Sequence, residues 1–128
     1  MSIATPAVVV VDPILSGAPY CAAVRAMGLR LIGVVSLPDA FFTERMRKPD
    51  PQLFDRLIGG TDCSRIVRDL AIAGETVIAV IAGAESGVSL ADRLGHALGV
   101  AHNDMALLSA RRNKFDMKVG ARLAGLAT

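Results

Sequence analysis

The apolar residues of this chain are concentrated in runs at residues 7–11, 29–35 and 76–82, of which the first is continuous and the second contains Arg30. An apolar run without alternation is typical of a strand that is buried on both faces, as in the middle of a parallel sheet. Between these runs, apolar residues recur every three or four positions, which is the spacing of an amphipathic helix. The pattern therefore predicts strands that alternate with helices.

Three helices are predicted, at about residues 19–27, after a capping Thr61 or Asp62, and at about residues 89–98. Each pattern ends at a glycine, which is a common helix terminator. The positions expected to face inward are Tyr20, Ala23, Val24 and Met27 in the first helix, Ile66, Val67, Leu70 and either Ile72 or Ala73 in the second, and Leu90, Leu94, Ala97 and Leu98 in the third.

The remaining segments carry weaker signals. Pro38 and Asp39 predict a helix that continues to about Arg47, and residues 56–59 predict a short edge strand. Residues 100–103 predict either a last strand or a connector, and Ser109 is expected to cap a final helix. Taken together, the elements predict an α/β fold of three layers, with an open, mostly parallel sheet of about four strands.

Composition limits the class of protein. A chain of 128 residues, 52% hydrophobic, is expected to form one compact domain. Its apolar runs are far shorter than the roughly 20 residues of a membrane-spanning helix, and residues 1–13 show no export signal, so we expect a cytoplasmic protein that does not enter membranes. A net charge of +2 and few aromatic residues argue against a nucleic-acid partner.

Cysteine and histidine chemistry is not favoured by the spacing of these residues. Cys21 and Cys63 lie far apart and form no metal-binding motif, so buried thiols are expected. His96 and His102 are the two imidazoles, too few for a catalytic metal centre without a cluster of other ligands. No serine occupies the GxSxG frame of a hydrolase.

Two loops that follow predicted strands contain candidate binding residues. Asp12 and Ser16 follow the first strand, and Glu85 and Ser86 follow the run at residues 76–82. Ligands of open α/β sheets bind at the carboxyl ends of strands, so these four side chains are candidate ligand-binding residues. The alternative is that they serve turn formation and helix capping alone. Neither loop has the GxGxxG or Walker A pattern.

A row of basic residues follows Ser109. Its members are Arg111, Lys114, Lys118 and Arg122, spaced as neighbours on one helix face. The row is either a solvated face or, through Lys114, a contact for a nucleotide phosphate.

Several of these segments together resemble the N-terminal region of ATP-grasp ligases of the carboxylate-amine or amino-acid ligase type. The similar segments are VVVVDPILSG at residues 8–17, GAESGVSLADRL at residues 83–94, the connector at residues 98–103 and SARRNKFDM at residues 109–117. They extend over nearly the whole chain. One departure is Asn113, where the family usually has aspartate.

The resemblance implies a Rossmann-like pre-ATP-grasp domain at residues 1–105 and a linker helix at residues 106–128 that leads toward two ATP-gripping lobes absent from this chain. It places Lys114 near the ATP phosphates, and it places the two loops with Asp12, Ser16, Glu85 and Ser86 at the substrate pocket. The family uses ATP and Mg²⁺ to form an acyl phosphate that an amine attacks. Because the Mg²⁺ ligands and most adenine contacts lie in those lobes, we expect this chain alone to be inactive and not to bind either cofactor tightly.

The expected partners are therefore small carboxylate and amine substrates and the ATP-grasp lobes in the same polypeptide. Without those lobes, the apolar stripe of Phe115, Val119, Leu123 and Leu126 is expected to promote association of chains, giving a homo-oligomer, or to fray. The alternative is a standalone Rossmann-like module that binds a small ligand or a protein and catalyses nothing.

Overall fold

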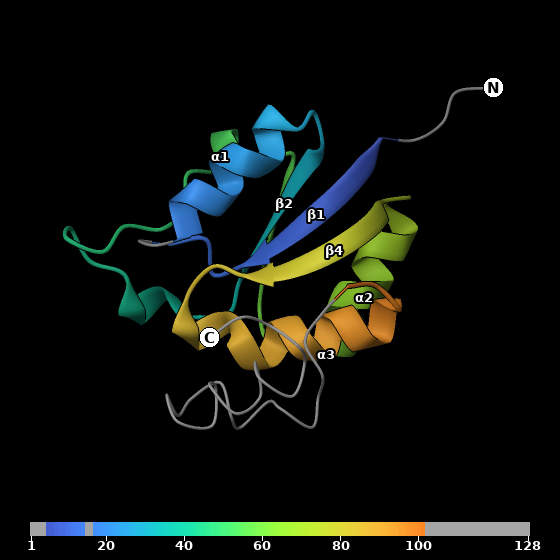
Figure 1. Ribbon diagram of the computed structural model, residues 1–128. Helices are drawn as coiled ribbons and strands as arrows, with labels where there is room; N and C mark the ends of the chain where they lie inside the picture. The colour runs from blue at the N-terminus through green and yellow to red at the C-terminus, as the bar shows by residue number, and fades with distance from the viewer. Residues whose placement is uncertain (1–4, 15–16, 102–128) are drawn as a thin grey trace, which may run out of the picture.

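The computed structural model describes residues 5–14 and 17–101. Four strands form a single parallel sheet in the order β3-β2-β1-β4: β1 (Pro6–Val11), β2 (Arg30–Val35), β3 (Arg56–Gly59) and β4 (Thr76–Ala82). Helix α1 (Ala18–Ala26) covers one face, and α2 (Cys63–Ile72) and α3 (Val88–Leu98) cover the other (Figure 1). The predicted three-layer α/β class with an open parallel sheet is confirmed.

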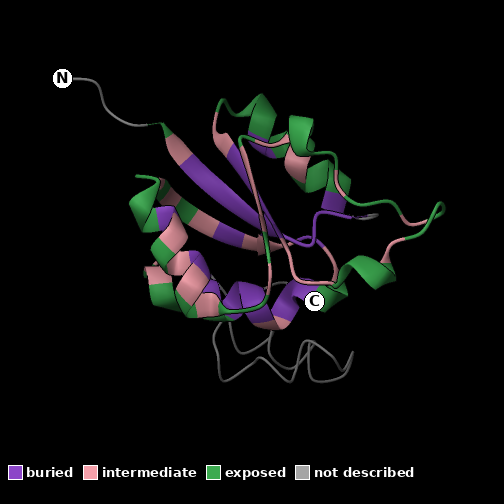
Figure 2. Cartoon of the chain, turned by 180° about the vertical axis from the view of Figure 1, so that it is seen from behind, coloured by how far each residue is buried: buried purple, intermediate pink, exposed green. Residues whose placement is uncertain are grey.

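Strand β1 lies in the middle of the core. Residues 7–11 of this strand are at most 5% exposed, and successive side chains pack on opposite faces of the sheet. Val8 and Val10 pack with Val24 of α1, whereas Val9 and Val11 pack with residues of α2 and α3. The buried band through the centre of Figure 2 follows this strand. Burial on both faces explains why the run at residues 7–11 has no polar alternation.

The helices begin and end near the predicted positions. Asp62 caps α2, because its side chain accepts a hydrogen bond of 3.2 Å from the backbone N–H of Arg65. Gly99 ends α3 in the left-handed conformation, with φ of 67°. The expected inner positions Val24, Ile66, Leu70, Leu90 and Leu94 are buried.

Other residues expected on the inner faces are not buried. Tyr20, Met27 and Ile72 are 47%, 70% and 78% exposed, and Ala97 is also exposed. Ile72 follows Leu70 by two residues, about 200° around the helix, so both cannot face the sheet. Met27 lies beyond the last turn of α1, and within α1 only Val24 is buried. The sequence pattern overestimates the width of the stripe that each short helix buries.

The prediction of a helix from Pro38 to about Arg47 is wrong. The connection between β2 and β3 contains two 3₁₀ turns instead, η2 (Asp39–Phe41) and η3 (Pro51–Leu53). Phe42 has an extended backbone, with ψ of 139°, and ends the first turn. Between Thr43 and Lys48, Met46 is half-buried and the others are exposed, so a helix here would have no continuous apolar stripe to bury. The expected edge strand is confirmed as β3.

The last described residue extends the sheet by one bridge. Ala101 pairs in parallel with Ala79 of β4, and the N–H of Val80 donates to the Ala101 carbonyl at 3.4 Å. This agrees with strand pairing near residue 101. The predicted linker helix at residues 106–128, the basic row, the apolar stripe and Ser16 lie outside the described residues.

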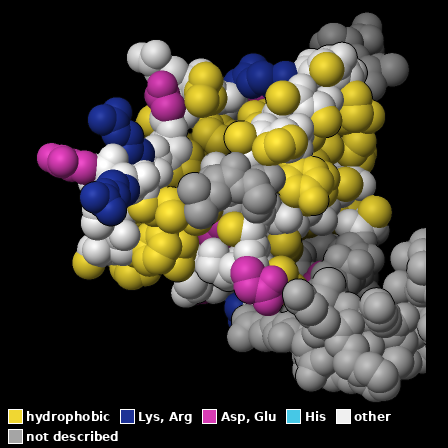
Figure 3. All heavy atoms as spheres, turned by 60° about the vertical axis from the view of Figure 1, so that its left-hand side comes forward, with side chains coloured by type: hydrophobic (Ala, Val, Ile, Leu, Met, Phe, Trp, Pro, Cys, Tyr) yellow, Lys and Arg dark blue, Asp and Glu magenta, His cyan; other side chains and the backbone are white. Residues whose placement is uncertain are grey.

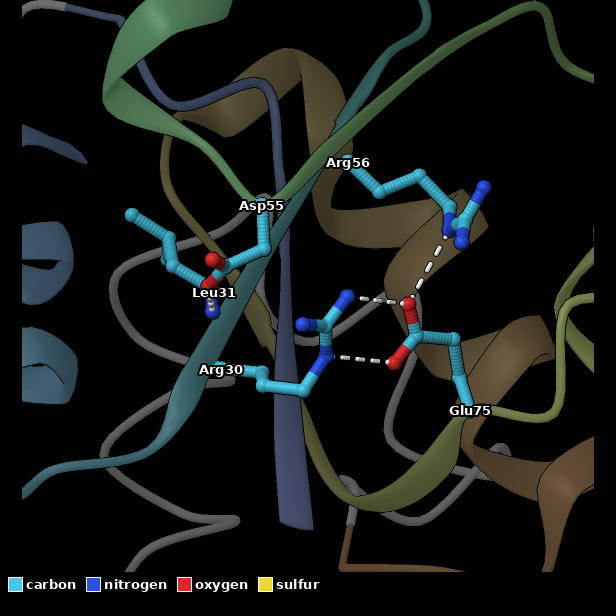
Figure 4. A network of polar contacts seen from close by, with 5 residues as sticks. All are labelled: Arg30, Leu31, Asp55, Arg56 and Glu75. Carbon is cyan, nitrogen blue, oxygen red and sulfur yellow. Dashed lines mark hydrogen bonds and ion pairs between the residues drawn. The ribbon is translucent and has the colours of Figure 1, made fainter. Parts of the chain in front are cut away.

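At the amino end of the sheet, a polar network joins the first residues of β2 and β3 to Glu75, which directly precedes β4 (Figure 4). The Glu75 side chain, 4% exposed, accepts two hydrogen bonds of 2.8 Å from Arg30 at the start of β2. A third, of 3.0 Å, comes from Nε of Arg56 at the start of β3. These contacts hold the pKa of Glu75 below its ordinary value of 4.5, mainly through the hydrogen bonds from Arg30 and against the effect of burial.

Replacement of Glu75 by Gln is expected to lower the free energy of unfolding at pH 7 by about 1–3 kcal/mol, because two arginines lose their buried carboxylate partner. Since folding lowers this pKa, the carboxylate stabilises the fold fully above pH 4.5, and the contribution is lost as the pH falls through the lowered pKa. Urea unfolding between pH 2 and 7 checks both effects. At low pH, Glu75→Gln should approach the wild type in stability. Glu44→Gln, at an exposed position, should be as stable as the wild type over the whole pH range.

Candidate functional site

The carboxyl ends of β1 and β4 meet at the point where the order of strands reverses. From β1 the chain proceeds to β2 and β3 on one side, and β4 then returns to the other side of β1 (Figure 1). In open α/β sheets the loops at such a point diverge, and ligands bind in the crevice between them. The candidate site is therefore built from the residues that follow β1, β2 and β4.

Asp12 is the centre of this edge. It directly follows β1, is 0% exposed, and has a positive φ of 54°, which is uncommon for a residue other than glycine. Oδ1 of Asp12 accepts a 2.7 Å hydrogen bond from the backbone N–H of Ser36, and Oδ2 accepts bonds of 2.5 and 2.7 Å from the hydroxyls of Ser36 and Ser86. One carboxylate thus joins the loops that follow three neighbouring strands.

These hydrogen bonds determine what the two serines offer to a ligand. A hydroxyl has one proton, and both protons here are donated to Asp12. The hydroxyl oxygens are left with lone pairs, so they act as acceptors. Ser86 is exposed and Ser36 is half-buried, so the two oxygens suit a ligand that presents N–H groups, such as an ammonium or an amide.

Glycines allow the loops at this edge to approach each other closely. A Cβ at Gly83 would lie 2.6 Å from the carbonyl oxygen of Asp12, and one at Gly87 would lie 2.7 Å from that of Val11. Both distances are too short for any side chain. Gly87 also precedes the first residue of α3, where no side chain caps the helix. The glycines of the segment at residues 83–87 are therefore required for tight backbone packing.

The structure brings together some of the candidate residues. Asp12 and Ser86 are in direct contact, because the strands that they follow, β1 and β4, are neighbours in the sheet. Glu85 is exposed in the 3₁₀ turn η4 (Glu85–Gly87), and Ser16 and Lys114 lie outside the described residues. Ser36 was missed, although it follows the apolar run at residues 29–35 as Asp12 follows that at residues 7–11.

Other chemistry has less support in the described residues. Cys21 and Cys63 are half-buried, not fully buried as expected. Burial raises the pKa of both thiols, which disfavours the reactive thiolate at neutral pH. Within residues 5–14 and 17–101, no three His, Cys, Asp or Glu side chains are grouped so that they could hold a metal ion.

Comparison with known proteins leaves the family open. No model of a protein family matches the sequence, and no curated protein matches it. Among the helices of the described ranges, none combines the length and apolar character needed to cross a bilayer. The described residues thus form an α/β domain with a polar site at the point where the order of strands reverses.

Proposed function

We propose that this chain is the N-terminal domain of an ATP-dependent carboxylate-amine ligase of the ATP-grasp type. In such an enzyme, a carboxylate takes the γ-phosphoryl group of ATP to form an acyl phosphate and ADP. An amine then attacks the acyl carbon, and inorganic phosphate leaves. The domain contributes to the substrate pocket and is inactive by itself. Its proposed location is the cytoplasm, where ATP is available.

One observation carries this proposal. The residues that follow β1 and β4 belong to two of the segments that resemble the ligases, at residues 8–17 and 83–94. They meet at one edge of the sheet through the hydrogen bond between Ser86 and Asp12. Their meeting at the position where α/β sheets bind ligands supports a shared role in a pocket.

The roles proposed for individual residues follow from this geometry. Asp12 orients Ser36 and Ser86, whose oxygens accept N–H groups of the amine substrate. Glu85 is exposed beside them and adds negative charge that favours an ammonium group. Ser16 and Lys114 keep the roles that the resemblance implies, at the substrate and at the ATP phosphates.

ATP and Mg²⁺ are the cofactors of the proposed enzyme, and Mg²⁺ would neutralise charge on the phosphates during transfer. The described residues contain no cluster suited to this ion. In the proposed enzyme, the ion is held by the lobes that the resemblance places after this domain.

The test uses the complete translated product of the gene. Purified protein is incubated with ATP, Mg²⁺, hydroxylamine and pools of carboxylic acids, because hydroxylamine converts an acyl phosphate into a hydroxamate that iron(III) colours. We expect hydroxamate that depends on ATP and on one acid, and Lys114→Ala should reduce its formation at least tenfold at limiting ATP. Arg68→Ala, at an exposed arginine of α2 outside the segments that resemble the ligases, is the control. A product that neither binds ATP nor forms hydroxamate contradicts the proposal.

A standalone module that binds a small ligand or a protein partner is the second candidate. It is favoured by a pocket at the carboxyl ends of β2 and β3, described below. A complete gene product without ATP-dependent chemistry that still binds a small molecule in this pocket would support it.

A further inference from the structure

A pocket of about 640 Å³ opens at the carboxyl ends of β2 and β3. It is not lined by the loops that the sequence indicated, although Ser36 of the candidate site lies at its wall. Its walls are largely apolar and include Val35, Leu37, Pro38, Pro49, Leu57 and Ile58. Pockets for small molecules have this character, with apolar walls and a few polar groups that orient the ligand.

The segment that forms one side of this pocket is unusual. Residues 36–55 connect two parallel strands without an α-helix, whereas such connections usually contain one. Long connections of this kind in compact domains are often binding segments. Pro38, Pro49 and Pro51 line the pocket and restrict the backbone, so its shape is largely formed before a ligand arrives.

One cation lines the pocket among the described residues. Nζ of Lys48 contacts Oδ1 of Asp39 at 2.5 Å, and both side chains are exposed, by 54% and 89%. Charged and hydrophobic side chains lie next to each other on this side of the molecule (Figure 3). An ion pair this exposed adds little stability. A carboxylate that arrives with a ligand can therefore take the place of Asp39 with little loss.

We propose that this pocket binds a small apolar carboxylic acid. The hydrocarbon part lies against the aliphatic and proline walls, and the carboxylate pairs with Lys48. A single ammonium suits a single carboxylate, whereas a phosphate is usually held by several donors. The site goes beyond the proposed ligase activity, because its occupation needs neither ATP nor Mg²⁺.

The experiment is a titration of the ¹⁵N-labelled 128-residue chain with 4-methylpentanoate, followed by NMR. The matched ligands are 4-methylpentanamide, which lacks the charge, and 4-methylpentylamine, which reverses it. We expect chemical-shift changes concentrated at residues 35–39, 48–51 and 57–61, and about tenfold weaker binding of the amide and the amine. Equal binding of the amide, tighter binding of the amine, or changes elsewhere in the chain would overturn the proposal.

Two variants make the test specific. Lys48→Met should weaken binding of the acid about tenfold, whereas Arg47→Met, which removes a neighbouring exposed charge that does not line the pocket, should leave it unchanged. Gly59→Val should also weaken binding, because Gly59 lines the pocket and its Cβ would have open space. Unfolding curves establish that each variant is folded. Unchanged binding by Lys48→Met would contradict the assignment, whatever the ligase assay shows.

Discussion

Gly83→Ala is expected to destabilise the domain by about 3 kcal/mol or more, a large part of the stability of a domain of this size. The added Cβ would lie 2.6 Å from the carbonyl oxygen of Asp12 and 3.0 Å from Cγ1 of Val10. The first contact is with backbone at the end of the central strand, which cannot move without disturbing the sheet. Urea unfolding followed by circular dichroism measures the loss.

Gly59→Ala is the matched control for this substitution. No heavy atom lies within 4 Å of a Cβ at Gly59, and its φ is outside the left-handed region. We expect a stability equal to that of the wild type or slightly higher, since alanine restricts the unfolded chain more than glycine does. If Gly83→Ala were as stable as Gly59→Ala, the close packing of the loops after β1 and β4 would be wrong.

Asp12→Ala is expected to lower the free energy of unfolding by about 3 kcal/mol. Three donors, the N–H and hydroxyl of Ser36 and the hydroxyl of Ser86, lose their acceptor, at about 1 kcal/mol each. Alanine also tolerates the positive φ of this position less well than aspartate. Thermal and urea unfolding should show a loss of stability with the sheet retained.

Asp12→Asn keeps the shape of the side chain but replaces one acceptor oxygen with an NH₂ donor. The asparagine oxygen can accept from the Ser36 N–H, and its NH₂ group can donate to both serine oxygens if the hydroxyl protons rotate away. We therefore expect a loss of about 1 kcal/mol or less. Asp39→Asn, at an exposed residue, controls for the change of charge. An Asn variant as unstable as the Ala variant would mean that the negative charge itself holds the three loops.

The change of hydrogen-bond polarity at Asp12 is also expected to affect function. In the asparagine variant the serine hydroxyls become available as donors, so the site should lose its preference for ligands with N–H groups. A ligase that contained Asp12→Asn should then show a raised KM for the amine with less change in the KM for ATP. A role of Asp12 in stability alone would leave the two KM values in their original ratio.

The candidate site was only partly predictable from the sequence. Asp12 and Ser86 could be predicted as site residues because a polar residue after an apolar strand lies at the carboxyl edge of a parallel sheet. That they share a hydrogen bond depends on β1 and β4 being neighbours, although 74 positions separate the two residues. Ser36 was overlooked because it has no motif around it, and its contact with Asp12 becomes evident once β2 is placed beside β1.

Local pattern was least informative where tertiary contacts decide between several conformations. Residues 38–47 have helix-forming side chains, but no apolar stripe that a helix could bury, and they form a 3₁₀ turn and an irregular loop. The pocket beside this loop is lined by residues from two separate stretches, 35–51 and 57–61. No spacing in the chain indicates that these stretches enclose a cavity.

The pattern of apolar runs was sufficient to predict the fold class and the parallel sheet, because strands buried on both faces are stable only between two layers of helices. Helix ends near Thr61 or Asp62, Gly74 and Gly99 were also predictable, since capping depends on neighbouring residues. The polar contacts at Asp12, the burial of each helix and the location of the pocket were not predictable from local sequence and became evident in the tertiary structure. Those features depend on the order of strands, which brings distant residues together.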